Sequence, residues 1–348
     1  MWPARAKDNQ EYSGGMKMKL GAYTACLHDK TLDEALGILA NMGLTSVELN
    51  AGGFIPSPHC PVDSLLANET SRRNFLAQIA DHGIELTALN VNGNPLHPDP
   101  EVRAKHSRDV TNAIELANKL GVRNVITMSG NPGGHADCST PNWVVEPWDS
   151  AYTEILDYQW NTVAIPFWKQ TNAIAVNAGV KVAIEMHPHN IVYNPATMVR
   201  LIEETGATNV GAEMDPSHLF WQGIDPIKAI EFLGDRVFFA AAKDIRINED
   251  YCQINGVLDG RFRVLGPDEP KVPLGGRYVC NAWPTNPSWQ FVAVGRGHDV
   301  AYWGRFLKAL EAANREIHCN IEHEDFELGQ LEGLESAAQT LHEAAALD

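Results

Sequence analysis

The chain has 348 residues and a formal net charge of −17 at pH 7. Hydrophobic residues make up 44% of it and charged residues 20%, which is typical of a folded globular protein. The acidic balance argues against nucleic acid and anionic membranes as partners, because polyanions bind to basic surfaces. No apolar run approaches the roughly 20 residues that a membrane-spanning helix needs.

The amino-terminal segment and the cysteines carry little sign of export. The first residues, MWPARAKDNQEYSGG, lack the apolar core of a signal peptide. The six cysteines are scattered and include no C-x-x-C pair, so we expect neither a disulfide framework nor a structural zinc site. This usage fits a reducing, cytoplasmic environment. We expect residues 1–17 to form a flexible extension and residues 18–348 a single domain.

From residue 20 onward, short apolar runs alternate with segments of helical spacing. The expected strands are residues 20–27, 45–50, 85–92, 122–130, 181–185, 209–215, 236–244 and 316–325. The expected helices are residues 32–42, 71–82, 101–120, 155–178, 195–205, 226–233 and 300–314, with a last helix within 326–348. Thr31 is placed to cap the first helix, and glycines such as Gly43 and Gly121 end several others.

Strands that alternate with helices predict a parallel sheet, and eight such pairs favour a closed barrel over an open sheet. The open alternative is weakened because no G-x-G-x-x-G follows an early strand. We therefore predict an α/β fold, a (β/α)₈ TIM barrel with long βα-loop insertions. Two long segments, residues 130–154 and 245–297, show no clear period, and loops of this length are usually functional.

Acidic and imidazole side chains gather where the later strands end. The stretch KVAIEMHPH, residues 181–189, is a short apolar run followed by Glu185, His187 and His189. The sixth expected strand ends at Asp215 and the eighth at Glu322, and the seventh ends in Lys243 and Asp244. In a barrel these carboxyl ends face one point, where three carboxylates would repel one another. A divalent metal removes the conflict: oxygen ligands favour Mn²⁺ or Mg²⁺, and an added imidazole favours Mn²⁺, Zn²⁺ or Co²⁺.

Over residues 18 to about 340 the chain resembles the xylose isomerase-like TIM barrels, also called sugar phosphate isomerases/epimerases. The opening match is LGAYTACLHDKTLDEALGILANMGLTSVELNAGG, and the more specific matches, in order, are EMHPHN, MDPSHLFWQGIDP, AKDIRIN, NGVLDG, VGRGHDVAYW and IEHED. Each motif alone is weak, but their order and spacing at successive strand ends form a strong combined signal.

The resemblance implies one divalent metal, with Mn²⁺ favoured, held by Glu185, Asp215 and Glu322. The family's remaining ligand is a histidine two residues before the lysine of a His-x-Lys-Asp motif, and Ala241 stands at that position here. Three interpretations follow. The ligand has been replaced in a variant, or three protein ligands suffice with water or substrate, or a neighbouring imidazole, His187 or His218, substitutes.

The resemblance also implies roles in proton transfer next to a carbonyl. Glu185 and Glu322 are the candidate acid/base pair, and His187, which shares a strand face with Glu185, is a candidate second base. The candidate substrate-binding residues are His218, Lys243, Arg246 and Trp143. Structural roles compete with these: rim salt bridges for the glutamates, a helix cap for Asp215, core packing for the imidazoles and the indoles, and neutralisation of Asp244 by Lys243.

These features predict a metal-dependent sugar isomerase or epimerase that acts on a small sugar or keto-sugar. One alternative is the catalytic subunit of a C-glycoside deglycosidase, a lyase that separates a 3-oxo-sugar from its aglycone and works with a small second subunit. Another is a catalytically inactive sugar-binding barrel. A metal-dependent endonuclease is disfavoured by the net charge. Members of this family often form oligomers, so we expect a homo- or hetero-oligomer.

Overall fold

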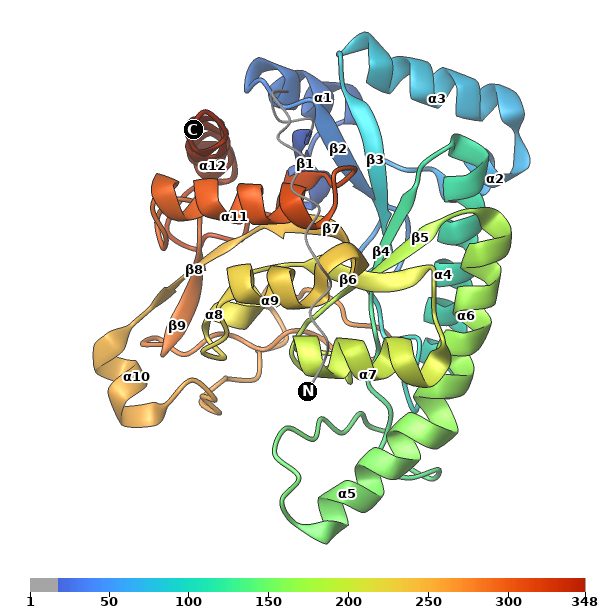
Figure 1. The fold of residues 1–348 in the computed structure, drawn as a ribbon, viewed down its shortest axis with the longest axis vertical. Coiled ribbons are helices and arrows are strands. Elements are labelled where there is room, and N and C mark those ends of the chain that lie inside the picture. The colour runs from blue at the N-terminus through green and yellow to red at the C-terminus, as the bar shows by residue number, and fades with distance from the viewer. Residues whose placement is uncertain (1–17, 348) are drawn as a thin grey trace.

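Eight parallel strands close into a barrel in the computed structural model, which describes residues 18–347 (Figure 1). Their hydrogen-bonded order is β1-β10-β7-β6-β5-β4-β3-β2. The strands are β1 (Leu20–Tyr23), β2 (Ser46–Asn50), β3 (Glu85–Asn90), β4 (Asn124–Met128), β5 (Lys181–Glu185), β6 (Val210–Met214), β7 (Val237–Ala242) and β10 (Cys319–Ile321). The prediction of a (β/α)₈ barrel is confirmed. The expected extension, residues 1–17, lies outside the described residues.

Helices surround the barrel (Figure 1). They are α1 (Leu32–Asn41), α2 (Val62–Ala67), α3 (Glu69–Asp81), α4 (Pro100–Leu120), α5 (Ser150–Asp157), α6 (Ile165–Ala178), α7 (Pro195–Thr205), α8 (Ser217–Phe220), α9 (Pro226–Leu233), α10 (Glu249–Asn255), α11 (Val300–Ala313) and α12 (Gln330–Ala345). Thr31 caps α1 in a capping box with Glu34, and Gly121 ends α4 in a left-handed conformation. None of the helices within residues 18–347 is long and apolar enough to cross a membrane.

Several expected elements differ in extent from those observed, and one helix was not expected. The strand expected over residues 20–27 ends at Tyr23, and Thr24–Leu27 is a 3₁₀ helix. The strand expected over residues 316–325 covers only Cys319–Ile321. The helix α2 was not expected, since six residues are too few to show a helical period. The helix expected over 155–178 begins at Ser150 and includes a π-helical segment, Tyr158–Ala164.

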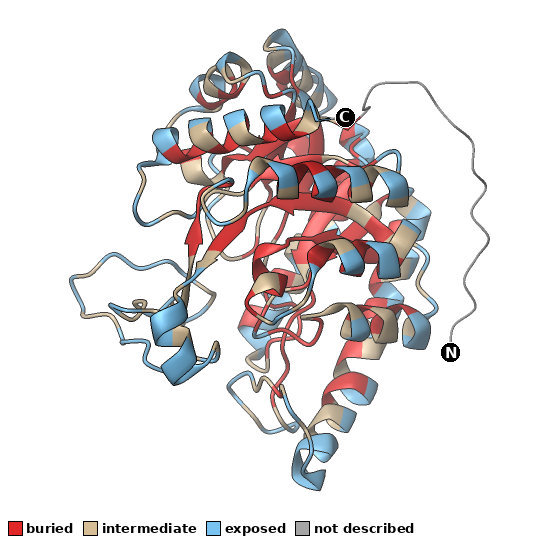
Figure 2. Ribbon diagram, turned by 60° about the vertical axis from the view of Figure 1, so that its left-hand side comes forward, coloured by how far each residue is buried: buried red, intermediate tan, exposed pale blue. Residues whose placement is uncertain are grey.

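The segment 245–297, for which no regular structure was expected, belongs largely to a β-hairpin with a long tip. Strands β8 (Asp244–Ile247) and β9 (Trp289–Val292) pair antiparallel, and α10 lies between them. Four-residue strands are too short to give a clear alternation of apolar and polar residues. Figure 2 shows that the chain between these strands is mostly exposed, whereas the barrel strands are buried.

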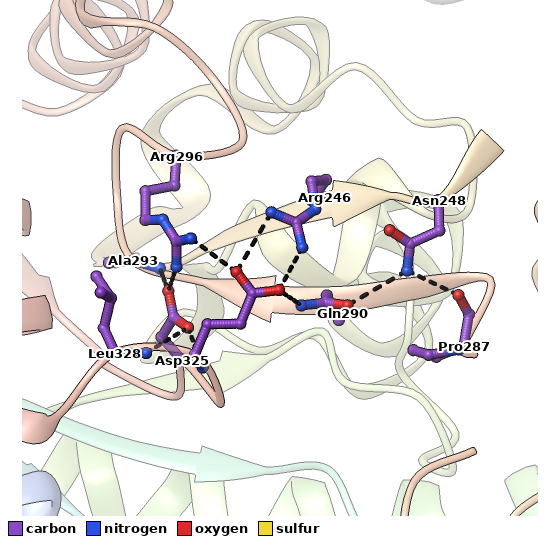
Figure 3. A network of polar contacts seen from close by, with 9 residues as sticks. Arg246, Asn248, Pro287, Gln290, Ala293, Arg296, Asp325 and Leu328 are labelled. Carbon is purple, nitrogen blue, oxygen red and sulfur yellow. Dashed lines mark hydrogen bonds and ion pairs between the residues drawn. The ribbon is translucent and has the colours of Figure 1, made fainter. Parts of the chain in front are cut away.

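Two carboxylates tie the hairpin to the chain that follows β10 (Figure 3). The Glu327 carboxylate accepts hydrogen bonds from Arg246, Arg296 and Gln290. The buried Asp325 carboxylate accepts from the backbone N–H of Ala293 and from Arg296. The hairpin is therefore held against the loop that carries the last predicted ligand of the site.

Inside the barrel, an apolar plug supports a polar upper layer. Ala88, Ile126, Ala183 and Phe239 form a separate buried cluster. Because successive strand residues point to opposite faces, the residues two positions further along also face inward. They are Glu185 after Ala183 and Ala241 after Phe239. The plug sets the floor of the site at the carboxyl end of the strands.

Candidate functional site

Three carboxylates converge at the carboxyl end of the barrel. Glu185 is the last residue of β5, Asp215 directly follows β6, and Glu322 directly follows β10. One oxygen from each lies within 4.8 Å of the others. Glu185 and Asp215 are buried, and 17% of the Glu322 side chain is exposed. Each of the three residues stands at the end of a barrel strand or directly after it, so the barrel fixes where its backbone lies.

An imidazole from the next turn completes this cluster. His218 lies on α8, and its Nε2 is 3.2 Å from Oε1 of Glu185 and 3.4 Å from Oδ2 of Asp215. Its ring centroid is 4.1 Å from that of His187. Together Glu185, His187 and His218 also offer three ligand atoms within 4.8 Å of one another. Glu185 therefore belongs to an all-carboxylate group and to a group that contains two imidazoles.

Several polar atoms in this cluster are buried without a hydrogen-bond partner among the described residues. They are Oδ2 of Asp215 and both ring nitrogens of His218, whose short approaches to the carboxylates lack hydrogen-bonding geometry. The other Asp215 oxygen accepts from the backbone N–H of Ser217. Buried polar atoms normally find partners, because an unmade hydrogen bond is costly. A cation between these oxygens and nitrogens would satisfy them, so the residues present fit a divalent metal.

The protonation states of His218 and Glu185 also favour metal binding. Burial lowers the pKa of His218 to about 3, which leaves a neutral imidazole with a free lone pair. Burial raises the pKa of Glu185, but contact with His218 and the nearby His187 outweighs burial and lowers this pKa to about 2. Burial raises the pKa of Asp215 to about 7 and that of Glu322 well above its ordinary value. When no cation is bound, burial therefore disfavours the charged form of the last two groups.

An ammonium group borders the cluster on the β7 side. Nζ of Lys243 lies 2.8 Å from Oε1 of Glu322 and 3.0 Å from Oε1 of Glu324, and 4.5 Å from the ring centroid of Phe291. Burial lowers the pKa of a lysine, but here Glu322, Glu324 and the other carboxylates raise it well above its ordinary value. Lys243 therefore stays charged beside one of the three carboxylates.

The alternative pairing of Lys243 with Asp244 is not the one observed. The Asp244 carboxylate accepts from the backbone N–H groups of Gly295, Gly297 and His298, and from the ring of His298. Gly297 permits this close approach, because a Cβ there would lie 1.9 Å from the carbonyl oxygen of Ile245. Asp244 thus anchors the loop after the hairpin and leaves Lys243 to the site.

Ala241 faces the same interior as Phe239 and Lys243, and it is 3% exposed. Its methyl group offers no ligand atom to the cluster. The imidazoles near the carboxylates come instead from residues after β5 and β6, namely His187 and His218. The β7 side of the cluster presents a methyl group and an ammonium group.

Two polar residues at this site escaped the sequence interpretation. Asn92 follows β3, and its Nδ2 donates to Oε2 of Glu185 over 2.6 Å, while its Oδ1 has no partner among the described residues. Glu324 shares Lys243 with Glu322. Both residues could have been predicted from the sequence. Asn92 ends the expected strand 85–92, whose carboxyl end faces the same site as those of the later strands. Glu324 lies two residues after Glu322, and residues two apart in an extended segment share a face.

Two expected substrate-binding residues lie outside the carboxylate cluster. Arg246 pairs with Glu327 on the hairpin, with 39% of its side chain exposed. Trp143 packs edge-on against His189 and Tyr193. His189 itself adopts a φ of 60°, which is uncommon for a residue with a side chain. The loop after β5 is thus bent sharply beside Trp143, away from His187 and His218.

The chain and its fold have known counterparts. The xylose isomerase-like TIM barrel family matches residues 36–346. The chain is 35% identical over 328 residues to the uncharacterized protein YfiH of Bacillus subtilis (strain 168), a match that covers 93% of this chain and 98% of that protein.

Two solved structures share the fold at low sequence identity. One is the 3-keto-D-glucoside 4-epimerase YcjR from E. coli, with a TM-score of 0.59, 13% identity, and coverage of 95% of this chain and 100% of that chain. The other is a xylose isomerase-like TIM barrel protein from Mycobacterium smegmatis in complex with magnesium, with a TM-score of 0.59, 17% identity, and coverage of 95% and 98%.

Proposed function

Because this chain belongs to the xylose isomerase-like TIM barrel family, we propose that it is a divalent-metal-dependent isomerase or epimerase. In this proposal it moves a proton on a carbon next to the carbonyl of a sugar or keto-sugar. The observation that carries the proposal is the convergence of Glu185, Asp215 and Glu322, with the imidazole of His218 beside the first two. The epimerase neighbour acts on a 3-keto-D-glucoside, which supports keto-sugars as the first substrates to test.

In the proposed site, the three carboxylates hold the metal and His218 supplies the imidazole that position 241 lacks. Mixed oxygen and nitrogen ligation favours Mn²⁺, with Mg²⁺, Co²⁺ or Zn²⁺ as alternatives. When bound, such an ion polarises the carbonyl and hydroxyl oxygens of the sugar and so lowers the cost of removing the neighbouring proton. The structure of the M. smegmatis protein with magnesium supports a divalent ion in this fold.

The proton is moved by side chains of the chain itself. Glu185 ends β5 and Glu322 directly follows β10, and β7 and β6 lie between these two strands in the barrel. The two glutamates would therefore reach a sugar between them from different directions. One removes the proton and the other returns it. Asn92 fixes one oxygen of Glu185 through its 2.6 Å hydrogen bond, which leaves the other oxygen facing His218. Lys243 is placed to donate to a substrate oxygen beside Glu322.

Deuterium exchange tests this function without a known product. The Mn²⁺-loaded protein would be incubated in D₂O with D-fructose and with 3-oxo-D-glucose, and the sugars analysed by mass spectrometry. We expect deuterium to enter the carbon next to the carbonyl of one of them. Glu185→Gln should abolish the exchange, whereas Glu69→Gln on the outer helix α3 should not. Absence of exchange in every ketose and keto-glucoside tested would argue against the proposal.

One observation favours a second activity, carbon–carbon lyase action on a 3-oxo-C-glycoside. His187 places a further imidazole 4.1 Å from that of His218 and close to Glu185, and an aglycone that leaves needs a proton donor. In this alternative the chain would be the catalytic subunit and would require a small partner subunit. If chromatography detects the release of an aromatic aglycone from a 3-oxo-C-glucoside, this activity would replace the epimerase proposal.

A further inference from the structure

An aromatic cavity of about 250 Å³ is built from the two long loops. Four indoles line it: Trp143 from the loop after β4, Trp221 after α8, and Trp283 and Trp289 from the hairpin segment. Trp221 and Trp289 lie nearly parallel, with ring centroids 5.4 Å apart, and Trp283 stands edge-on to Trp289. Flat apolar walls of this kind favour a planar, unsaturated ligand over a fully hydroxylated one.

One aromatic ring separates the cavity from the carboxylate cluster. Phe291 of β9 contacts Trp289 and Trp283 on the cavity side, with centroid distances of 5.3 and 5.9 Å. On the other side it lies edge-on to His218 at 5.7 Å and under the ammonium of Lys243 at 4.5 Å. A molecule that occupied both places would have to extend past Phe291.

The lining offers a ligand few polar groups. The indole N–H groups of Trp143 and Trp221 and the hydroxyl of Ser288 are buried, with almost no accessible surface. No lysine or arginine is among the described residues that line the cavity, and its one acidic residue, Asp259, is paired with Arg261. A phosphate group would find no cation here.

We propose that this cavity binds a planar aromatic ring joined to the sugar that occupies the carboxylate cluster. The substrate is then an aryl glycoside or its keto form, with no phosphate on the ring that enters the cavity. This inference rests on the proposed function, since it takes the carboxylates as the sugar site. The volume is that of a ring system of modest size, below the 300 to 1,000 Å³ typical of drug-sized ligands.

Paired probes test the proposal. Isothermal titration of the Mn²⁺-loaded protein would compare para-nitrophenyl β-glucoside with methyl β-glucoside. We expect the aryl glucoside to bind about 10-fold more tightly, which corresponds to one well-packed aromatic contact. Trp283→Leu should remove this preference and leave the affinity for methyl β-glucoside within about 2-fold. Trp148→Leu is the matched control, because its indole is 86% exposed and lies outside the cavity.

Three outcomes would overturn the proposal. The two glucosides bind equally, or the preference survives in both Trp283→Leu and Trp143→Leu, or para-nitrophenol alone binds as tightly as its glucoside. Thermal unfolding of each variant identifies a folding defect, and the second tryptophan variant serves if the first fails to fold. Deuterium exchange into a free ketose does not use the cavity. Exchange without aryl preference would refute this inference alone, and aryl preference without exchange would refute the proposed function alone.

Discussion

The Nε2 atom of His218 lies 3.2 Å from Oε1 of Glu185, and neither His218 nitrogen makes a hydrogen bond among the described residues. This imidazole follows Asp215 by three residues and reaches the carboxylates from the β6 side. Ala241, on β7, leaves the β7 side of the cluster without a ligand atom. In the proposed function, His218 would take the place of the histidine that position 241 lacks.

We expect His218→Ala to weaken Mn²⁺ binding by more than about 10-fold, since even residues that only orient ligands contribute 10 to 100-fold. Titration calorimetry measures the affinity, and pulsed electron paramagnetic resonance detects nitrogen bound to Mn²⁺. The nitrogen signal should disappear in His218→Ala. His82→Ala is the control, because that imidazole pairs with Asp33 on the outer helices.

The companion substitution is Ala241→His. In the His218→Ala background it should restore Mn²⁺ affinity, because residue 241 faces the cluster from β7. In the otherwise unchanged protein it should add little. Unchanged affinity in His218→Ala would assign the metal to the carboxylates alone. An inactive sugar-binding barrel would bind no metal in any of these variants.

Lys243→Met should separate metal binding from catalysis. Removing an ammonium group 2.8 Å from Glu322 removes a repulsive charge, so we expect tighter Mn²⁺ binding. Activity should fall by at least about 10-fold, as expected for a lost proton or hydrogen-bond donor. The metal-free variant should unfold at a lower temperature, because the partly buried Glu322 carboxylate loses its ion-pair partner. Lys181→Met, at the opposite end of β5, is the control. Weaker metal binding in Lys243→Met would contradict this view.

The stability of the metal-free protein should fall as the pH rises from about 6.5 through about 7. Burial raises the pKa of Glu48 and of Asp215 to about 7, and those of Glu213 and Glu322 well above the ordinary value of 4.5. Within this window the unfolded chain has already released these protons while the folded chain still holds some of them. The folded state therefore binds more protons, and a higher pH favours unfolding.

The buried histidines do not reverse this trend. Burial lowers the pKa of His28 from 6.5 to about 4. Above about pH 6.5 this imidazole is therefore neutral in both the folded and the unfolded chain, and a further rise in pH no longer changes its contribution to stability. Thermal unfolding with EDTA and with saturating Mn²⁺ measures the slope. The metal should flatten or invert it, because it binds deprotonated carboxylates. A metal-free protein that becomes more stable across this window would show that these groups are ionised in the folded state.

Glu327→Ala should loosen the hairpin with little effect on the whole fold. Its carboxylate joins Arg246, Arg296 and Gln290, yet 41% of its side chain is exposed (Figure 3). Exposed ion pairs contribute roughly 0–1 kcal/mol to the free energy of unfolding. Hydrogen exchange should accelerate in β8 and β9 while the barrel strands stay protected. Glu269→Ala, which breaks an ion pair with Arg263 at the hairpin tip, is the control. Equal acceleration in both variants would contradict a special role for Glu327.

The alternation of strands and helices and the positions of Glu185, Asp215 and Glu322 could be predicted from the sequence. Both depend on local patterns: an apolar run marks a strand, and in a parallel barrel every strand ends at the same face. The residue at each strand end is therefore placed by the backbone alone. The absence of a histidine at position 241 was visible for the same reason.

The sequence by itself thus determined the barrel and the strand ends at which the acidic residues stand. Only the tertiary structure decided that Lys243 pairs with Glu322 and Glu324, that Arg246 pairs with Glu327, and that the tryptophans of two distant loops line one cavity. These contacts join residues far apart in the chain. They depend on the directions of side chains and on loop paths, which are set by long-range packing rather than by local periodicity.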